Sequence, residues 1–341
     1  MTVADGLCGV QERQASDVDD PDALRALALD CRPTVIRGHC SHWPVTRASA
    51  RGADAAMAYL VHYAAGQTAE YFSAPASLAG RYHYGEALSG FNFSRETIDI
   101  RDALLRISAN ALSGLETGYM GSLPAELCFP GFAADNPSHV LDGHIRPRVW
   151  IGNLSTVACH YDSYDNLACV VAGRRRFTLY PPAAIGDLYI GPIDHTLSGQ
   201  PVSMVAGLTD RADVYPRFAA AQAKAIVVEL RAGDALYLPK LWWHQVEALD
   251  PVNILVNYWW DGFAAGPDSP YATLLLAMIA IAERPAPERA AWRAYFDHYV
   301  FRPDGHPLAH LPEEKHGVLG PLAQGNYGRI RASVMRMLRG A

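Results

Sequence analysis

The residues best suited to chemistry lie in one short stretch of the chain. His160 and Asp162 are separated by a single residue, and no other of the 13 histidines stands two positions before an acidic residue. Successive side chains of a β-strand point to opposite faces, so an extended segment presents this imidazole and this carboxylate on one face. Two ligands do not hold a metal ion, and the sequence L-P-K-L-W-W-H-Q-V-E offers His244 as a third.

Two histidines and one carboxylate on one face of a metal ion are the ligand set of non-heme Fe(II) oxygenases. This arrangement leaves the opposite positions of the metal open for a cosubstrate and O2. Each residue taken alone is more often structural, because a histidine near aromatic residues is commonly buried and hydrogen-bonded. Taken together, His160, Asp162 and His244 predict a catalytic metal centre.

Three consecutive arginines after Gly173 are candidates to bind an anion. A strand through F-T-L-Y at 177–180 places Arg175 on the same face as Phe177, and Arg174 and Arg176 on the other face. An arginine on an apolar, inward face needs an anionic partner, because burying it unpaired is costly. Arg175 is therefore the predicted carboxylate-binding residue. The alternative is that all three arginines form a solvated or phosphate-facing surface.

An ordered set of segments resembles the JmjC and cupin-like 2-oxoglutarate-dependent oxygenases. The segments are H-Y-D at 160–162, Asn166, G-R-R-R-F-T-L-Y-P-P from Gly173, G-D-A-L-Y-L-P-K-L-W-W-H ending at His244, and L-V-N-Y-W-W ending at Trp260. Within this family the chain is most similar to the branch that includes the asparaginyl hydroxylase of hypoxia signalling and its bacterial relatives. The motif-dense part of the resemblance extends from about Tyr119 to Trp260, with weaker likeness on either side.

The resemblance implies a double-stranded β-helix that uses Fe(II), 2-oxoglutarate and O2. In such enzymes the cosubstrate is converted to succinate and CO2 while the substrate is hydroxylated, and the substrate is expected to be a protein side chain or a small molecule. It also implies that Asn166, Asn257 and Tyr119 contact the cosubstrate or lie near the metal, and, with a one-residue shift, that Thr156 does. The position of Arg175 is usually lysine in the hydroxylase, so this chain keeps the positive charge there but has a longer and wider head group.

Two rival functions stay open at this point. One is a non-catalytic cupin that binds a ligand in its barrel, and the other is a cupin that uses another metal for isomerisation. The H-x-D spacing, in place of H-x-H with a following Glu, favours the oxygenase. Demethylation is less favoured than hydroxylation, because no reader module or zinc cluster accompanies the predicted barrel.

The composition indicates a globular protein. Half of the 341 residues are hydrophobic and 19% are charged, and the net charge of -6 argues against nucleic-acid binding through bulk electrostatics. The six cysteines include no C-x-x-C pair, the N-terminus shows no secretory signal, and the longest apolar stretch, 271–282, is too short to span a bilayer. We expect a cytoplasmic protein that binds neither nucleic acid nor a membrane.

The chain is predicted to have three regions: residues 1–110 with helices and a strand, a catalytic barrel at 111–262, and a helical region at 268–341. Closely spaced strands separated by turn residues indicate a mainly β barrel or jelly roll. Strands are expected at 34–38, 147–153, the ligand segment, 177–180, 226–230, 235–238 and 254–259, and helices after Asp20 and at 53–65, 102–107, 271–283 and 290–300.

Three further segments carry expectations about the site and the assembly. The aromatic-rich segment 71–93 either lines a substrate cleft or packs in the core. The long insertion within 174–224 is expected to fold over the barrel mouth. The two C-terminal helices are expected to form a hairpin on the barrel or a subunit interface; in the hydroxylase that the chain resembles, C-terminal helices mediate dimerisation, so we expect a homodimer.

Overall fold

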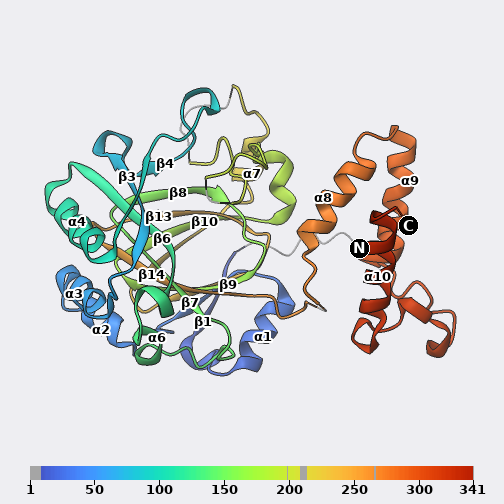
Figure 1. The fold of residues 1–341 in the computed structure, drawn as a ribbon, viewed down its shortest axis with the longest axis horizontal. Coiled ribbons are helices and arrows are strands. Elements are labelled where there is room, and N and C mark those ends of the chain that lie inside the picture. The colour runs from blue at the N-terminus through green and yellow to red at the C-terminus, as the bar shows by residue number, and fades with distance from the viewer. Residues whose placement is uncertain (1–8, 198, 208–212, 265, 341) are drawn as a thin grey trace. The chain divides into compact units, whose positions relative to one another are not determined.

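The computed structural model describes residues 9–197, 199–207, 213–264 and 266–340. They form two compact units with the boundary between Gly262 and Phe263. The first unit is built on a pair of facing β-sheets with helices outside them, as Figure 1 shows. The predicted mainly β fold, with helices before and after the sheets, is confirmed.

Eight consecutive strands make the double-stranded β-helix. Four of them are neighbours in the larger sheet in the order β12-β9-β14-β7, and the other four form the smaller sheet in the order β11-β10-β13-β8. All pairings within these two groups are antiparallel. The strands are β7 (Pro147–Gly152), β8 (Ser155–His160), β9 (Asp165–Ala172), β10 (Arg174–Tyr180), β11 (Ile226–Arg231), β12 (Ala235–Leu238), β13 (Trp243–Ala248) and β14 (Asn253–Trp260).

Strands from the first part of the chain extend both sheets. At one edge of the larger sheet β2 joins β12, and at the other edge β6 joins β7. The smaller sheet gains β4, which runs parallel to β8. The described part of the first unit is thus one structure to which residues before 111 contribute strands. These strands are β1 (Gln11–Gln14), β2 (Thr34–Arg37), β3 (Thr68–Pro75), β4 (Arg81–Tyr82), β5 (Ser94–Asp99) and β6 (Glu116–Pro124).

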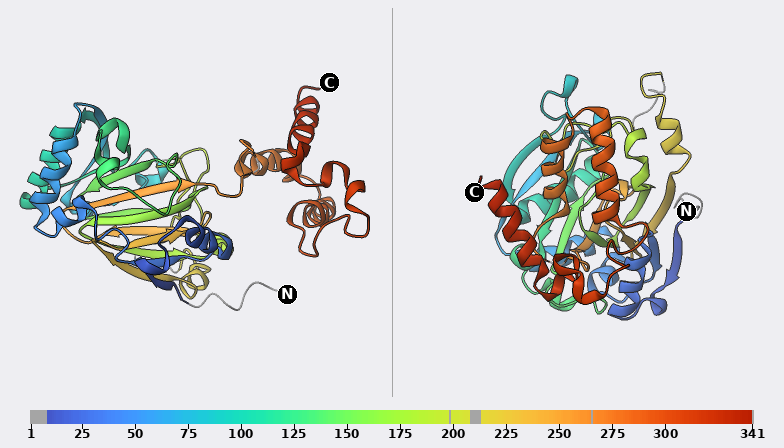
Figure 2. Two further views of the ribbon diagram at one scale, coloured as in Figure 1. Left: turned by 90° about the horizontal axis from the view of Figure 1, so that it is seen from below. Right: turned by 90° about the vertical axis from the view of Figure 1, so that its right-hand side faces the viewer.

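Helices cover the outer face of the larger sheet, as the two views of Figure 2 show. Apolar side chains of these helices and of the outward-facing strand positions form one continuous core. Because helices cover this face and the barrel interior covers the other, every residue of β9 is buried. The helices are α1 (Pro21–Asp30), α2 (Pro44–Ser49), α3 (Ala53–Tyr63), α4 (Ile100–Ser113), α5 (Ala125–Cys128) and α6 (Phe132–Asp135).

The inner faces of the two sheets meet in a second apolar cluster. Phe177 and Leu179 of β10 belong to it, which places the alternate residue Arg175 on the same inward face. Gly173 sets this alternation because it forms the turn between β9 and β10 with φ of +71°. A Cβ atom at Gly173 would lie 2.5 Å from Oδ1 of Asn253, so another residue does not fit.

The long connection between β10 and β11 contains a 3-10 helix, Pro182–Asp187, and α7 (Phe218–Gln222). Between these elements the chain passes the open end of the barrel and contributes Leu197, Gln200 and Val202 to the cavity described below. The expectation that this insertion folds over the barrel mouth agrees with these contacts.

The second unit consists of helices with little interior of their own. Neither α8 (Pro270–Ile281) nor α9 (Ala286–Phe296) contains a buried residue, and Asn326 is the buried residue of α10 (Asn326–Leu338). Large apolar side chains are exposed along all three helices, namely Leu274, Leu275, Met278, Ile279, Trp292, Tyr295, Ile330, Val334, Met337 and Leu338. In the described part of the chain, no helix combines the length and apolar character needed to cross a membrane.

Candidate functional site

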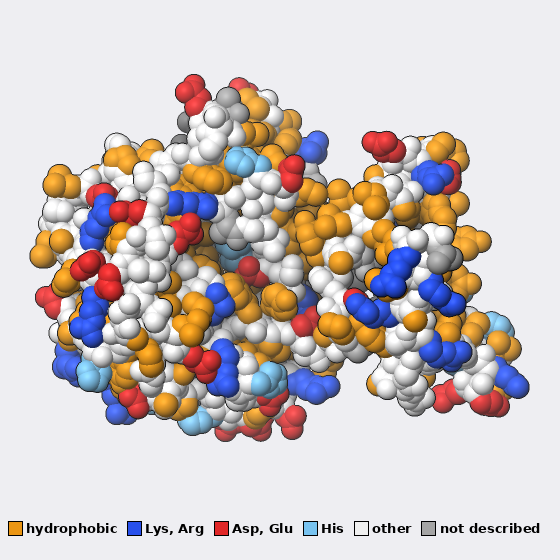
Figure 3. All heavy atoms as spheres, in the orientation of Figure 1, with side chains coloured by type: hydrophobic (Ala, Val, Ile, Leu, Met, Phe, Trp, Pro, Cys, Tyr) orange, Lys and Arg blue, Asp and Glu red, His pale blue; other side chains and the backbone are white. Residues whose placement is uncertain are grey.

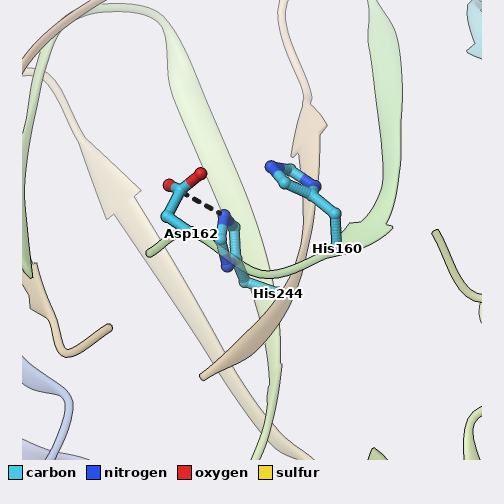
Figure 4. A group of neighbouring side chains, drawn as sticks. All are labelled: His160, Asp162 and His244. Atoms are coloured by element: carbon cyan, nitrogen blue, oxygen red, sulfur yellow. Dashed lines mark ion pairs between the residues drawn. The ribbon is translucent and has the colours of Figure 1, made fainter. Parts of the chain in front are cut away.

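Three side chains predicted to bind a metal converge inside the barrel, as Figure 4 shows. His160 is the last residue of β8, and His244 lies on the neighbouring strand β13, where the two residues are register partners. Asp162 does not continue the strand: β8 ends at His160, and the carboxylate comes from the turn that leads to β9. The prediction that one strand presents both His160 and Asp162 is therefore wrong in its geometry, although the turn brings the same residues together.

The geometry of the three groups suits a metal ion. One ligand atom from each lies within 4.8 Å of the other two, and Nε2 of His244 is 3.8 Å from Oδ2 of Asp162. The Nδ1 atoms of His160 and His244 lie 2.8 Å and 3.0 Å from the backbone carbonyls of Ala158 and Trp242. A carbonyl oxygen only accepts, so each Nδ1 donates its proton and each Nε2 keeps a free lone pair for a metal.

Burial keeps His244 in its neutral, metal-binding form. The side chain is 4% exposed. Loss of hydration, followed by the proximity of His160, lowers the pKa of His244 to about 4, and this outweighs the opposing effect of Asp162. At neutral pH the imidazole is therefore ready to bind a metal without first losing a proton.

Hydrogen bonds hold the carboxylate of Asp162 in place. Nε1 of Trp259 donates to its Oδ2 over 3.2 Å, and Nδ2 of Asn166 donates to the same oxygen over 3.5 Å. The backbone N–H of Leu241 donates to the carbonyl of Asp162 over 2.9 Å, which ties this turn to the segment that leads to His244. Partners of this kind fix the orientation of a metal ligand and leave Oδ1 available.

The three ligands line a cavity of about 450 Å³ at the open end of the barrel. Figure 3 shows the hollow on this face of the first unit, with acidic and basic side chains around it. Most of the wall is apolar or aromatic, including Phe72, Tyr82, Tyr119, Trp150 and Trp259. A largely apolar wall with a few polar groups is typical of a small-molecule site.

Arg175 lies on the cavity wall without an anionic partner among the described residues. It is 5% exposed, and its Nε makes no hydrogen bond within the described part of the protein. Burial lowers the pKa of Arg175 to about 10, and Tyr119 opposes this shift weakly. Its neighbours differ: Arg174 pairs with Asp250 at 2.9 Å and Arg176 with Glu229 at 2.6 Å, both near the surface. The strand alternation therefore separates one buried arginine from two exposed ones.

The amides predicted to lie in the site form one hydrogen-bonded chain. Nε1 of Trp150 donates to Asn257 over 2.6 Å, Asn257 donates to Asn166 over 3.1 Å, and Asn166 reaches Asp162. Both amides and Tyr119 line the cavity. This chain connects the larger sheet to the carboxylate of the metal site.

Thr156 is not among the described residues that line the cavity. Its neighbour Val157 packs toward the barrel interior, so alternation along β8 turns Thr156 outward. Trp242 and Trp243, which precede His244, are not among the described residues that line the cavity and pack in apolar clusters. Trp259, which sequence reasoning did not assign to the site, lies two residues after Asn257 on β14, and that spacing was the available signal.

The profile of the cupin-like domain matches residues 21–266 of the chain. The chain belongs to the cupin-like domain family. This is the JmjC and cupin family of 2-oxoglutarate-dependent oxygenases, as the sequence resemblance indicates. Family membership agrees with the double-stranded β-helix and with the three converging ligands.

Several curated proteins are similar to parts of this cupin-like chain. Lysine-specific demethylase JMJ31 of Arabidopsis thaliana is 39% identical over 30% of this chain and 18% of its own length. HSPB1-associated protein 1 of Homo sapiens is 33% identical over 42% of this chain and 30% of its own length. Jumonji C domain-containing protein 5 of Drosophila melanogaster is 28% identical over 71% of this chain and 59% of its own length. The chain thus matches less than two thirds of each relative.

The residues present fit the groups that the cupin-like family implies. Two imidazoles and one carboxylate are ligands suited to Fe(II), and the three leave other positions around the ion unfilled by described His, Cys, Asp or Glu side chains. The buried guanidinium of Arg175 fits a carboxylate, whose charge would replace the hydration that burial removes.

Proposed function

We propose that this protein is an Fe(II)- and 2-oxoglutarate-dependent oxygenase that hydroxylates a protein side chain or a small molecule and releases succinate and CO2. The observation that carries the proposal is that one cavity holds a His-Asp-His group that could bind a metal ion and a buried arginine without an anionic partner among the described residues. A ligand-binding cupin needs a cavity but not this pairing of groups.

His160, Asp162 and His244 would hold Fe(II), which with O2 supplies the oxidising chemistry of the reaction. Trp259 and Asn166 keep the Asp162 carboxylate oriented, as their hydrogen bonds to Oδ2 indicate. The neutral imidazole of His244 offers its Nε2 lone pair at the pH of the reaction.

Arg175 would bind the distal carboxylate of 2-oxoglutarate through a charge-assisted hydrogen bond. Tyr119 offers a phenol and Asn257 an amide on the same wall, and both can bond a carboxylate without changing the charge of the site. In the bound state the guanidinium gains the partner that it lacks in the free protein.

The aromatic wall would limit water around the reacting atoms. Trp150 and Trp259 meet at 5.7 Å between ring centroids, and Tyr119 lies 6.4 Å from Trp150. The two indole rings are fixed by hydrogen bonds, that of Trp150 to Asn257 and that of Trp259 to Asp162. A dry and rigid wall strengthens electrostatic contacts with the cosubstrate and prevents side reactions.

Two assays test the proposal. The protein is incubated with Fe(II), 2-oxoglutarate and O2, and succinate is measured, since turnover without the primary substrate is expected to be slow but detectable. In parallel, 2-oxoglutarate is added to the Fe(II) protein without oxygen, and a charge-transfer absorption band is expected. If both signals are absent in metal-loaded protein, the proposal is wrong and a ligand-binding or isomerase-type cupin is favoured.

We also propose that the protein is a homodimer and that the second unit supplies the interface. The support is the exposed apolar surface of α8, α9 and α10 and the lack of buried side chains in α8 and α9. Apolar surface of this extent is uncommon on a monomer. A second copy of the same helices can cover it symmetrically.

A further inference from the structure

The outer part of the cavity holds a second arginine, far along the chain from Arg175. Arg95 of β5 lines the cavity together with Phe72 and Phe93. Its guanidinium carbon lies 5.1 Å from the ring centroid of Phe72, 4.6 Å from that of Phe91 and 5.3 Å from that of Phe93. At such distances each ring attracts the cation. Three phenyl rings therefore hold this guanidinium at the cavity wall.

The connection between β10 and β11 fixes Arg95 from the other side. Nη2 of Arg95 donates a hydrogen bond to the backbone carbonyl of Leu197, which also lines the cavity. His195 of the same connection stacks its ring on Phe91, with 5.3 Å between the ring centroids, and so holds the connection against the phenyl rings around Arg95. Rings and loop together place the guanidinium before any substrate binds, which lowers the entropy lost on binding.

Arg95 retains donors for a further partner. Within the described residues its Nη2 has the carbonyl of Leu197, whereas Nη1 and Nε make no hydrogen bond. Among the described residues the closest carboxylate is that of Glu70, whose Oε1 is 3.9 Å from Nη1, beyond hydrogen-bonding distance. The Glu70 side chain is 54% exposed, so water screens this pair and its attraction is weak.

The aromatic rings that contact Arg95 are no longer free to hold a substrate cation. A methylated lysine is recognised by aromatic rings around its ammonium group. Here Phe72 and Phe93 already contact a guanidinium of the protein itself, and a second cation beside it would be repelled. Apart from Glu70, the outer wall described here offers no acidic side chain to offset that repulsion.

We propose that Arg95 is a substrate-recognition residue and that it binds a carboxylate of the substrate, so that the substrate is acidic and is not a methylated lysine. This inference rests on the proposed oxygenase function and names the substrate class. A substrate carboxylate would accept a hydrogen bond from Nη1, where Glu70 now lies, while Leu197 keeps its hydrogen bond from Nη2. Glu70 competes for the same guanidinium, so binding of an acidic substrate displaces this weak contact.

Binding of defined probes tests the inference. The protein is loaded with Zn(II) in place of iron and with saturating 2-oxoglutarate, and probe binding is followed by saturation-transfer NMR. The probes are capped tripeptides Gly-X-Gly with X as aspartate, asparagine or trimethyllysine, and free N-acetylalanine as a small carboxylate. The aspartate peptide or N-acetylalanine should bind at least about tenfold more tightly than the other two probes, as loss of a charge-assisted hydrogen bond implies.

Two variants with opposite expected effects sharpen the test. Arg95→Gln should weaken binding of the carboxylate probes about tenfold, and Glu70→Gln should strengthen it a few-fold because a competitor is removed. Glu96→Gln is the matched control for Glu70→Gln, because it also removes one negative charge, here from β5 next to Arg95. Glu96 pairs with Arg106 and is not among the described cavity residues. This substitution should leave probe binding unchanged.

The outcomes separate the inference from the function on which it rests. Stabilisation of each variant by 2-oxoglutarate against heat shows whether it is folded and whether the cosubstrate site works. If 2-oxoglutarate stabilises none of the proteins, the oxygenase proposal fails. If 2-oxoglutarate stabilises all of them, either of two results overturns the inference. One is that the trimethyllysine or asparagine peptide binds as tightly as the carboxylate probes. The other is that Arg95→Gln binds the carboxylate probes as tightly as the wild-type protein does. Preference for the peptide or for N-acetylalanine distinguishes a polypeptide from a small-molecule source of the carboxylate.

Discussion

Replacing Arg175 by methionine should stabilise the free protein while it weakens binding of 2-oxoglutarate. Burial lowers the pKa of Arg175 to about 10, which is roughly two to three pKa units below the usual value for an arginine. At 1.36 kcal/mol per unit, this corresponds to about 3 kcal/mol spent on keeping the guanidinium charged in the cavity wall. Methionine fills a similar volume without charge, so we expect the free energy of unfolding to rise by about 1–3 kcal/mol.

The complex with 2-oxoglutarate should respond in the opposite direction. Removing one partner of a buried ion pair costs roughly 3–5 kcal/mol, because the other charge is left uncompensated. The dissociation constant of 2-oxoglutarate should therefore rise by roughly two to four orders of magnitude. The dissociation constant of 2-oxoglutarate for Arg175→Lys should lie between those for the wild-type protein and Arg175→Met, since lysine keeps the charge but loses the forked hydrogen bonding of guanidinium.

The assay is urea unfolding with and without saturating 2-oxoglutarate, in protein loaded with Mn(II). Arg176→Met is the control, since Arg176 pairs with Glu229 at the surface and should change either measurement by little. The argument from strand alternation is refuted if Arg176→Met abolishes the stabilisation by 2-oxoglutarate and Arg175→Met retains it. A large loss of stability in free Arg175→Met would show that the guanidinium is paired in solution.

Four further predictions concern the metal, the site hydrogen bonds, acid stability and assembly. Asp162→Ala should abolish turnover and metal binding with an unchanged circular dichroism spectrum; normal metal affinity would refute the ligand assignment. Trp259→Phe removes the hydrogen bond to Asp162 and should raise the dissociation constant for Mn(II) about tenfold, which a metal titration checks. Burial lowers the pKa of His39 from 6.5 to about 4, so the unfolded state binds more protons at mildly acid pH and stability falls as pH drops below 6.5; between pH 7 and pH 5, urea unfolding should show a loss about 2 kcal/mol larger in the wild-type protein than in His39→Gln, and equal losses in both proteins would contradict this. Light scattering at micromolar concentration should give the mass of a dimer, and the mass of a monomer would refute the proposed interface.

The larger part of the barrel is predictable from sequence because its strands follow simple patterns. The expected strands at 147–153, 226–230, 235–238 and 254–259 appear within one or two residues as β7, β11, β12 and β14. These strands combine β-branched and aromatic residues with turn residues at both ends. The predicted helices at 53–65 and 271–283 likewise appear as α3 and α8.

Other strands were missed because tertiary pairing, not local composition, makes them extended. β5 reads S-R-E-T-I-D and is mostly exposed, so no apolar alternation marks it. β13 reads W-H-Q-V-E-A and forms between β8 and β10. β3 begins in a polar stretch and places Tyr71 in the core and Phe72 in the cavity, so both readings of the aromatic segment hold for different residues.

The site shows the same division between local pattern and tertiary arrangement. The side of Arg175 follows from alternation along one strand, and that prediction needs no knowledge of the rest of the fold. The position of Asp162 does not follow in this way, because the chain leaves the smaller sheet at His160 and enters the larger sheet at Asp165. Thr156 points outward because its neighbour Val157 faces the interior. The family motif matches Thr156 only with a one-residue shift, and a shift of one residue along a strand reverses the predicted face.

The metal site therefore depends on how the two sheets face each other. His160 and His244 come from adjacent strands of the smaller sheet, whereas Asn166, Asn257 and Trp259, which lead to Asp162, belong to the larger sheet. The separation of the sheets is set by apolar side chains between them, which resist compression because protein interiors are close-packed. A change in that packing would move the carboxylate relative to the imidazoles without touching a ligand. The apolar interior of the barrel is thus part of what positions the three proposed metal ligands, and its volume matters for their arrangement as well as for the fold.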